Sequence, residues 1–162
     1  HYDPRNKVLR LSDATYGQCS VAAVGVAAHE CGHAIQHARG YAPLQFRSAL
    51  VPVANFGSMI AWPLIVLGLF INSQSSALLI NIGILAFSLA VLFQLVTLPV
   101  EYNASGRAVR ILAETGMMQG EEIVATKKVL NAAALTYVAS AAAAILQLVR
   151  ILILTGGRRR DD

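Results

Sequence analysis

Five consecutive residues, His29-Glu30-Cys31-Gly32-His33, form the pattern HExxH. On a helix each residue turns about 100° and rises about 1.5 Å, so the two histidines lie on one face, one turn apart. Two imidazoles at this spacing can bind one tetrahedral metal ion. Glu30 lies on the same half of the helix, where a carboxylate can serve as general base for a zinc-bound water without being a ligand. Cys31 points away from this face, which predicts a small packing residue. The alternative is a pair of helix histidines that are merely packed or solvated.

His37 continues the same row of histidines, eight residues after His29. The helix rises about 12 Å over that interval, which is too far for both side chains to bind one ion. The longer pattern HExxHxxGxxH is absent, because Arg39 stands where its third histidine would be. We therefore expect His37 either to contact one of the metal ligands without binding the metal itself, or to lie on the surface.

A third ligand must come from elsewhere in the chain, and Glu101 is the best candidate. It follows the apolar run that ends in Thr97-Leu98-Pro99-Val100, where an ionisable group is costly unless it is paired or bound to a cation. Two histidines, a distant glutamate and a water form a known catalytic zinc set. On a helix Ser105 shares the face of Glu101. The alternative for Glu101 is an interfacial glutamate that pairs with arginine or reaches water. Weaker ligand candidates stand in a polar helix together with Lys127 and Lys128; these are Glu114, Glu121 and Glu122.

The composition indicates a membrane protein. Charged residues make up 14% of the 162 residues, the apolar set makes up 56%, and the mean hydropathy is +0.55. The net charge of +4 comes from basic residues that lie mainly in the first fifty and last five positions. That distribution suits a membrane surface, and it argues against nucleic acid because no aromatic-interleaved basic groove is present. Cys19 and Cys31 would lie about 18 Å apart on one helix, too far for a disulfide, which favours a reducing compartment.

Three apolar segments, at about 49–71, 77–100 and 132–154, are each long enough to cross about 30 Å of hydrocarbon as a helix. We therefore expect a mainly α, integral membrane fold in a single domain over 1–162. The uncharged stretch 72–76 reads as a turn between the first two spans. The positive-inside rule places a catalytic segment 1–48 and a connector 101–131 in the cytoplasm. The tail Arg158-Arg159-Arg160 then falls outside, against the rule, so either the third segment does not cross fully or the tail is partly foreign to the natural chain.

The first forty residues carry signals for short elements. Asp3-Pro4-Arg5-Asn6 has turn chemistry, and residues 7–12 read as one short strand or half of a hairpin, which could hold an extended peptide by main-chain pairing. Ser20 is a plausible N-cap of the HExxH helix, and Gly40 is a plausible residue just beyond its C-terminus. The chain opens without an initiator Met or a signal peptide, so we expect that an N-terminal segment is missing.

Several separate blocks resemble the YugP-like family of bacterial membrane zinc metallopeptidases, from His1 to about Ala144. These blocks are HYDPRNKVLRLS, AAHECGHAIQH, LVPVANFGS, FQLVTLPVEYNASGRA and LNAAALTYVASA. The resemblance implies a neutral, zinc-dependent, membrane-embedded endopeptidase, similar in logic to HtpX-like enzymes. It implies one zinc ion per chain on His29, His33 and Glu101, with Glu30 as the base. Related enzymes usually have an aspartate where this chain has Ser105, and they usually carry an additional N-terminal membrane segment.

The resulting hypothesis is zinc-assisted peptide hydrolysis at the cytoplasmic face of the bacterial inner (plasma) membrane. Its expected partners are a peptide or membrane-protein substrate and the lipid bilayer, with no nucleic acid. Tyr102, Tyr137 and Arg107 are possible partners for the oxyanion. Two rival classes stay open: a non-catalytic membrane protein in which zinc staples the loops to the helices, and a small transporter or structural protein with a fortuitous HExxH. Metal analysis followed by a cleavage assay with and without chelator separates the three.

Overall fold

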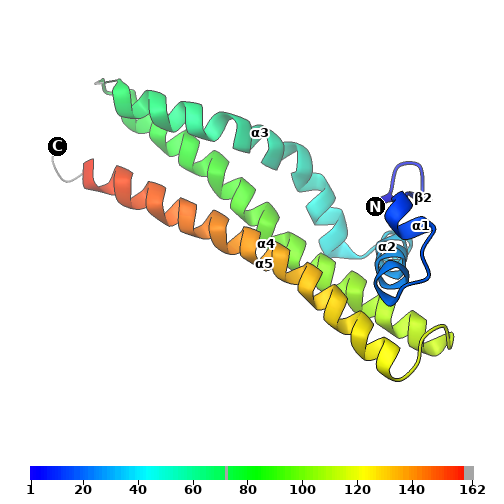
Figure 1. The fold of residues 1–162 in the computed structure, drawn as a ribbon. Coiled ribbons are helices and arrows are strands. Elements are labelled where there is room, and N and C mark those ends of the chain that lie inside the picture. Colours follow the sequence, from blue (N-terminus) through cyan, green and yellow to red (C-terminus); the bar gives the residue numbers. More distant parts are fainter. Residues whose placement is uncertain (72, 159–162) are drawn as a thin grey trace. The chain divides into compact units, whose positions relative to one another are not determined.

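The computed structural model describes residues 1–71 and 73–158, and its elements are almost all helices (Figure 1). A two-stranded antiparallel hairpin, β1 (Tyr2–Asp3) and β2 (Val8–Leu9), comes first, with Tyr2 opposite Leu9 and Asp3 opposite Val8. Five helices follow within the described residues: α1 (Asp13–Tyr16), α2 (Val21–Ala38), α3 (Ala42–Phe70), α4 (Ser76–Glu114) and α5 (Glu121–Arg158). This confirms the predicted mainly α fold with a short N-terminal hairpin.

The hairpin turn is stabilised by the carboxylate of Asp3. It accepts hydrogen bonds from the main-chain N–H groups of Arg5 and Asn6 and from the side chain of Asn6, and it pairs with Arg10 at 3.1 Å. The Asn6 side chain, followed by the main-chain donors and Arg10, lowers the pKa of Asp3. This is the turn that Asp3-Pro4-Arg5-Asn6 predicted, and it holds β1 in place against α2.

The ends of α2 follow the capping signals in the sequence. The hydroxyl of Ser20 accepts a hydrogen bond from the main-chain N–H of Ala23 at 3.2 Å. Gly40 adopts a positive φ of 62° just beyond the helix, a conformation that glycine takes without steric cost. Both predicted caps are confirmed, and they define the helix that carries HExxH.

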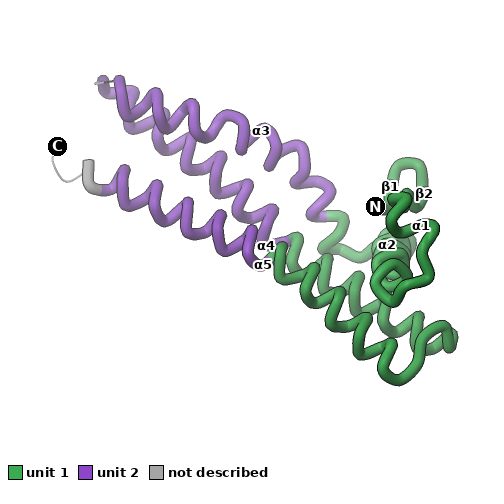
Figure 2. The backbone as a smooth tube through the Cα atoms, viewed as in Figure 1, with its two compact units in different colours: residues 1–45, 97–137 green, residues 46–96, 138–162 purple. Residues whose placement is uncertain are grey.

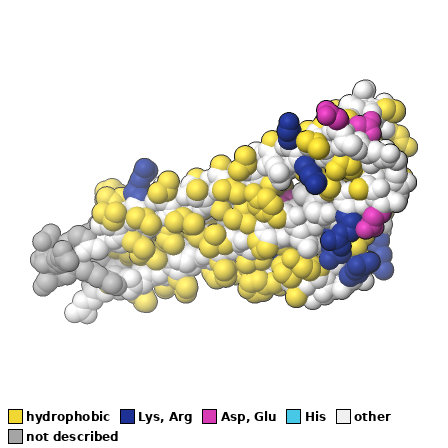
Figure 3. Space-filling model, turned by 90° about the horizontal axis from the view of Figure 1, so that it is seen from below, with side chains coloured by type: hydrophobic (Ala, Val, Ile, Leu, Met, Phe, Trp, Pro, Cys, Tyr) yellow, Lys and Arg dark blue, Asp and Glu magenta, His cyan; other side chains and the backbone are white. Residues whose placement is uncertain are grey.

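Three of the described helices have the length and hydropathy of a membrane span: Ala42–Phe70, Ser76–Glu114 and Glu121–Gly156. The segments expected at 49–71, 77–100 and 132–154 fall on them, although Ile71 lies just past α3 and Asn72 of the expected turn lies outside the described residues. Figure 3 shows hydrophobic side chains over much of one face of these helices. Arg159 and Arg160 of the basic tail also lie outside the described residues, so the orientation of the third segment stays a prediction.

Helices α4 and α5 share segment 101–131, which we expected to be a cytoplasmic connector, and its place relative to the membrane stays a prediction. Helix α4 runs without interruption from the apolar residues to Glu114, and α5 begins at Glu121. The break falls between them, at Gly116 and Gly120, which both have positive φ. Glu101 therefore lies inside a long helix.

Two compact units divide the chain (Figure 2). Unit 1 contains residues 1–45 and 97–137, and unit 2 contains residues 46–96 together with the described part of 138–162. In unit 2, α3 and α4 approach closely at glycines. A Cβ on Gly57 would lie 2.7 Å from the carbonyl oxygen of Ala86, and one on Gly83 would lie 3.0 Å from that of Ala61. Small residues at such contacts are typical of helices that pack within membranes.

Candidate metal centre

All three candidate ligands lie in unit 1, on α2 and on residues 97–114 of α4. Helix α2 can approach α4 because Gly32 has no side chain. A Cβ at Gly32 would collide with the main-chain carbonyl of Ala104. Ala104 is fully buried, and so is Gln36 one turn beyond Gly32. One of the two unspecified positions in HExxH is therefore a glycine because the helix must lie directly against the helix that carries Glu101.

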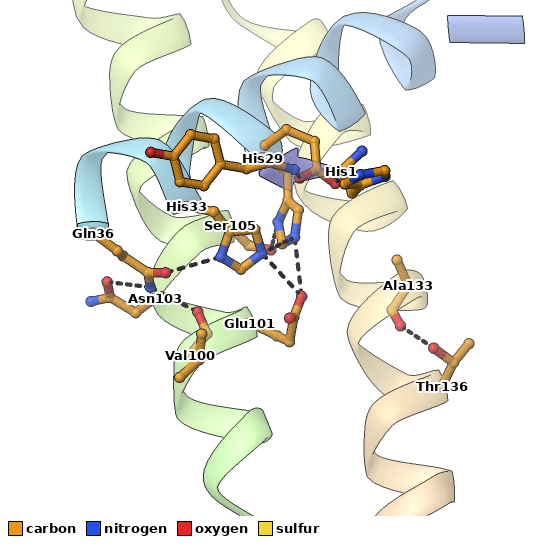
Figure 4. Close-up of polar contacts among 12 residues, drawn as sticks. His1, His29, His33, Gln36, Val100, Glu101, Asn103, Ser105, Ala133 and Thr136 are labelled. Carbon is orange, nitrogen blue, oxygen red and sulfur yellow. Dashed lines mark hydrogen bonds and ion pairs between the residues drawn. The ribbon is translucent and has the colours of Figure 1, made fainter. Parts of the chain in front are cut away.

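The candidate ligand atoms converge at one point (Figure 4). The Nε2 atoms of His29 and His33 are 3.1 Å apart, and Glu101 Oε2 lies 3.1 Å from the first and 3.6 Å from the second. Zinc ligands at 2.0–2.1 Å in a tetrahedron are separated by about 3.3–3.4 Å. The three measured edges bracket that value, so this donor set fits a zinc ion with a fourth corner left over.

The site is shielded from solvent. The side chains of His29, His33 and Glu101 are 16%, 12% and 4% exposed. A carboxylate with so little exposure is costly unless a cation compensates it. The buried carboxylate of Glu101 therefore needs a positive charge where it meets the two imidazoles, which either a proton on an imidazole or a metal ion supplies.

The second nitrogen of each imidazole has its own partner. His29 Nδ1 lies 3.0 Å from the hydroxyl of Ser105, and His33 Nδ1 lies 3.0 Å from the amide oxygen Oε1 of Gln36. Such contacts orient the ring of a metal-binding histidine. In this chain both partners are uncharged, a hydroxyl for His29 and an amide oxygen for His33.

Glu30 is held by the N-terminal hairpin. The main-chain N–H of Tyr2 donates a 2.7 Å hydrogen bond to Glu30 Oε2, and the side chain of Glu30 is 17% exposed. The hydroxyl of the same tyrosine is hydrogen-bonded to His37 Nδ1 at 2.7 Å. His37 is thus occupied by Tyr2, outside the group of ligand atoms. Burial raises the pKa of the neighbouring Cys31 thiol, and the charge of Glu30 adds to the effect, in keeping with a packing role for Cys31.

Among the described residues, the others that the sequence suggested are not part of the group of ligand atoms. Glu114, Glu121 and Glu122 are exposed, and Glu122 accepts a hydrogen bond from the main-chain N–H of Gln119. Arg107 donates to Asn103 Oδ1 at 2.8 Å and lies over the ring of Tyr41. Tyr102 and Tyr137 are 44% and 37% exposed. No role in stabilising an oxyanion follows from these positions.

Sequence reasoning missed Gln36 and the main-chain contact of Tyr2. Gln36 follows His33 by three residues, so helical spacing alone could have placed its amide beside the imidazole. The contact of Tyr2 had a weaker signal, since a strand near the site was expected but its register was not.

An HExxH helix packed on a helix that supplies a glutamate is the arrangement expected of a zinc metallopeptidase. Comparison with known proteins supports this class. The family model described as "Putative neutral zinc metallopeptidase" matches residues 1–156, and the chain belongs to this family. It is 46% identical over 159 residues to the "Putative membrane protease YugP" of Bacillus subtilis (strain 168), a match that covers 98% of this chain and 69% of that protein. No solved structure matches the chain.

Proposed function

We propose that this protein is a zinc-dependent endopeptidase of the membrane, in which His29, His33 and Glu101 hold one zinc ion and Glu30 is the general base. The observation that carries the proposal is the spacing of the three ligand atoms, 3.1, 3.1 and 3.6 Å, which is that of one face of a zinc tetrahedron. Membership in a family described as zinc metallopeptidases supports the choice of metal.

When bound, zinc supplies a Lewis acid that polarises the scissile carbonyl and lowers the pKa of a water molecule. Glu30 accepts a proton from the attacking water on its carboxylate and then delivers it to the nitrogen of the leaving amine. The Tyr2 N–H holds Oε2 of this carboxylate and so restricts its rotation. His29 and His33, whose rings are oriented by Ser105 and Gln36, would hold the metal through Nε2.

The substrate is a peptide or a membrane protein, cleaved at the cytoplasmic side of the bacterial plasma membrane. Three helices with the properties of membrane spans and a relative named a membrane protease support the location. The orientation follows from the positive-inside rule, because basic residues accompany the segment that carries HExxH. These are Arg5, Lys7, Arg10, Arg39 and Arg47.

Metal analysis and a cleavage assay on the purified chain in detergent test this proposal. We expect about one zinc per chain, cleavage of an unstructured protein substrate, and loss of cleavage with chelator that returns with zinc. Stoichiometric zinc without turnover would instead indicate a structural site, and absence of tightly bound metal would remove the metal centre altogether.

Glu30→Gln separates the base from the ligands. The amide is nearly isosteric but cannot accept the proton, so we expect cleavage to fall by about 10²–10⁴-fold while the zinc content stays at the parent level. Cys31→Ala, one residue further on the same helix, is the matched control and should keep most of the activity. Cleavage by Glu30→Gln at the parent rate would exclude Glu30 as the base.

A further inference from the structure

We propose that Gln36 is a positioning residue that fixes His33 in the tautomer with the proton on Nδ1, and so keeps the Nε2 lone pair available for the metal. The inference rests on the proposed zinc site, because only a metal ligand needs that particular nitrogen unprotonated. It follows from the directions of four hydrogen bonds on α2 and α4, within unit 1.

The first fixed direction comes from the main chain of α4. The side-chain nitrogen of Gln36 lies 2.9 Å from the carbonyl oxygen of Val100. A carbonyl oxygen can only accept a hydrogen bond, so the group that faces it must be the NH₂ end of the Gln36 amide. The other end, Oε1, must then face His33.

The hydrogen bond from Arg107 to Asn103 gives the same orientation of the Gln36 amide. A guanidinium can only donate, so the atom of Asn103 that Arg107 Nε contacts at 2.8 Å must be the oxygen Oδ1. The same Oδ1 lies 3.0 Å from the side-chain nitrogen of Gln36, which must therefore donate to it. Both hydrogens of the Gln36 amide are used, one on Val100 and one on Asn103.

The orientation of Gln36 determines the proton on His33. Oε1 of Gln36 lies 3.0 Å from His33 Nδ1, and an amide oxygen can only accept, so Nδ1 must carry a hydrogen. In a neutral imidazole the other nitrogen is then unprotonated, and this is the nitrogen that lies near His29 Nε2 and Glu101 Oε2. Figure 4 shows the chain of contacts from Asn103 and Val100 through Gln36 to His33.

Burial makes this constraint strong. Gln36 is 0% exposed, so water cannot replace any of its partners, and a rotated amide would face Val100 and Asn103 with an oxygen instead of donors. His29 differs, because the Ser105 hydroxyl that contacts its Nδ1 can either donate or accept. Of the two imidazoles, His33 is thus the one whose protonation pattern the fold itself imposes.

The test uses the full chain in detergent, with ¹⁵N-labelled histidine and no metal. The chain has four histidines, so a His33→Gln variant assigns the His33 signals. We expect nitrogen chemical shifts of the Nδ1–H tautomer for His33 in the parent. In Gln36→Met, which has similar volume but no hydrogen bonds, His33 should become a mixture of tautomers. A parent His33 with its proton on Nε2 would overturn the inference, whether or not the chain proves to be a peptidase.

Zinc affinity, measured by competition with a chelator, gives the second readout. Gln36→Met should bind zinc about 10–100-fold more weakly than the parent. Thr126→Val is the control for lost stability, because Thr126 is another fully buried polar residue of unit 1, on α5. Equal affinities in Gln36→Met and the parent, or equal losses in Gln36→Met and Thr126→Val at matched thermal stability, would contradict the positioning role.

Discussion

Both units have close glycine contacts between helices, but in unit 1 buried polar side chains also join the helices, whereas unit 2 relies on glycine and alanine. Six polar side chains are buried in the described part of the chain, and only Thr155 belongs to unit 2, where its hydroxyl bonds the carbonyl of Ile151 in its own helix. The other five belong to unit 1: Gln36, Thr97, Glu101, Ser105 and Thr126. Polar contacts are directional and can orient ligand atoms, while glycine contacts only bring helices close. The difference indicates that the side chains of unit 1 orient ligand atoms, whereas those of unit 2 allow apolar helices to pack closely.

Substitution of one glycine in each unit should give the largest contrast. Gly32→Val places a side chain against the Ala104 carbonyl, so α2 must move away from α4 and we expect zinc binding to be lost. Gly83→Val lies against Ala61 and Ile65 in unit 2, and it should lower the thermal unfolding temperature while zinc stays at the parent stoichiometry. Zinc content and thermal unfolding in detergent measure both effects.

Gly106→Ala is the control for these two variants, because a Cβ at Gly106 meets nothing within 4 Å. It should unfold at the same temperature or slightly higher, since alanine favours a helix over glycine by up to about 1 kcal/mol. Full zinc binding by Gly32→Val would show that the close approach of α2 and α4 does not set the ligand geometry.

Removal of the ligand that α4 supplies should have the next largest effect. Glu101→Ala takes away the one anionic donor of the candidate set. We expect zinc affinity to fall by more than about a hundredfold, because loss of a residue that only hydrogen-bonds a ligand already costs about 10–100-fold. Glu114→Ala, an exposed glutamate at the end of the same helix, should bind zinc like the parent. Chelator competition measures both, and the reverse ranking would move the third ligand to Glu114.

A smaller change should follow from a charge introduced beside His29. Ser105→Asp replaces the neutral partner of His29 Nδ1 by a carboxylate, which makes the imidazole a better donor, and we expect zinc affinity to rise about tenfold. The same competition assay measures the gain, with Ser105→Asn as the uncharged control. An equal affinity in both variants would mean that the charge of the outer partner does not matter in this site.

Much of the candidate site could be predicted because it depends on local periodicity. The spacing of His29 and His33 is a property of any helix, and a glutamate at the end of an apolar run is conspicuous on energetic grounds. The role of Gln36 could not be predicted, because it depends on which carbonyl of α4 faces α2. The helix was expected to continue past Val100, since Glu101 and Ser105 were placed on one helical face, but its end at Glu114 was not predicted.

The hydrogen bond from Tyr2 to Glu30 comes from the main-chain N–H, so position 2 must keep this N–H but need not keep its side chain for this contact. Every amino acid except proline brings the same N–H, so the support of the proposed base survives almost any exchange of the side chain. What it depends on is strand alignment: a slip of the hairpin by one residue would turn a different face of β1 towards α2 and remove the donor.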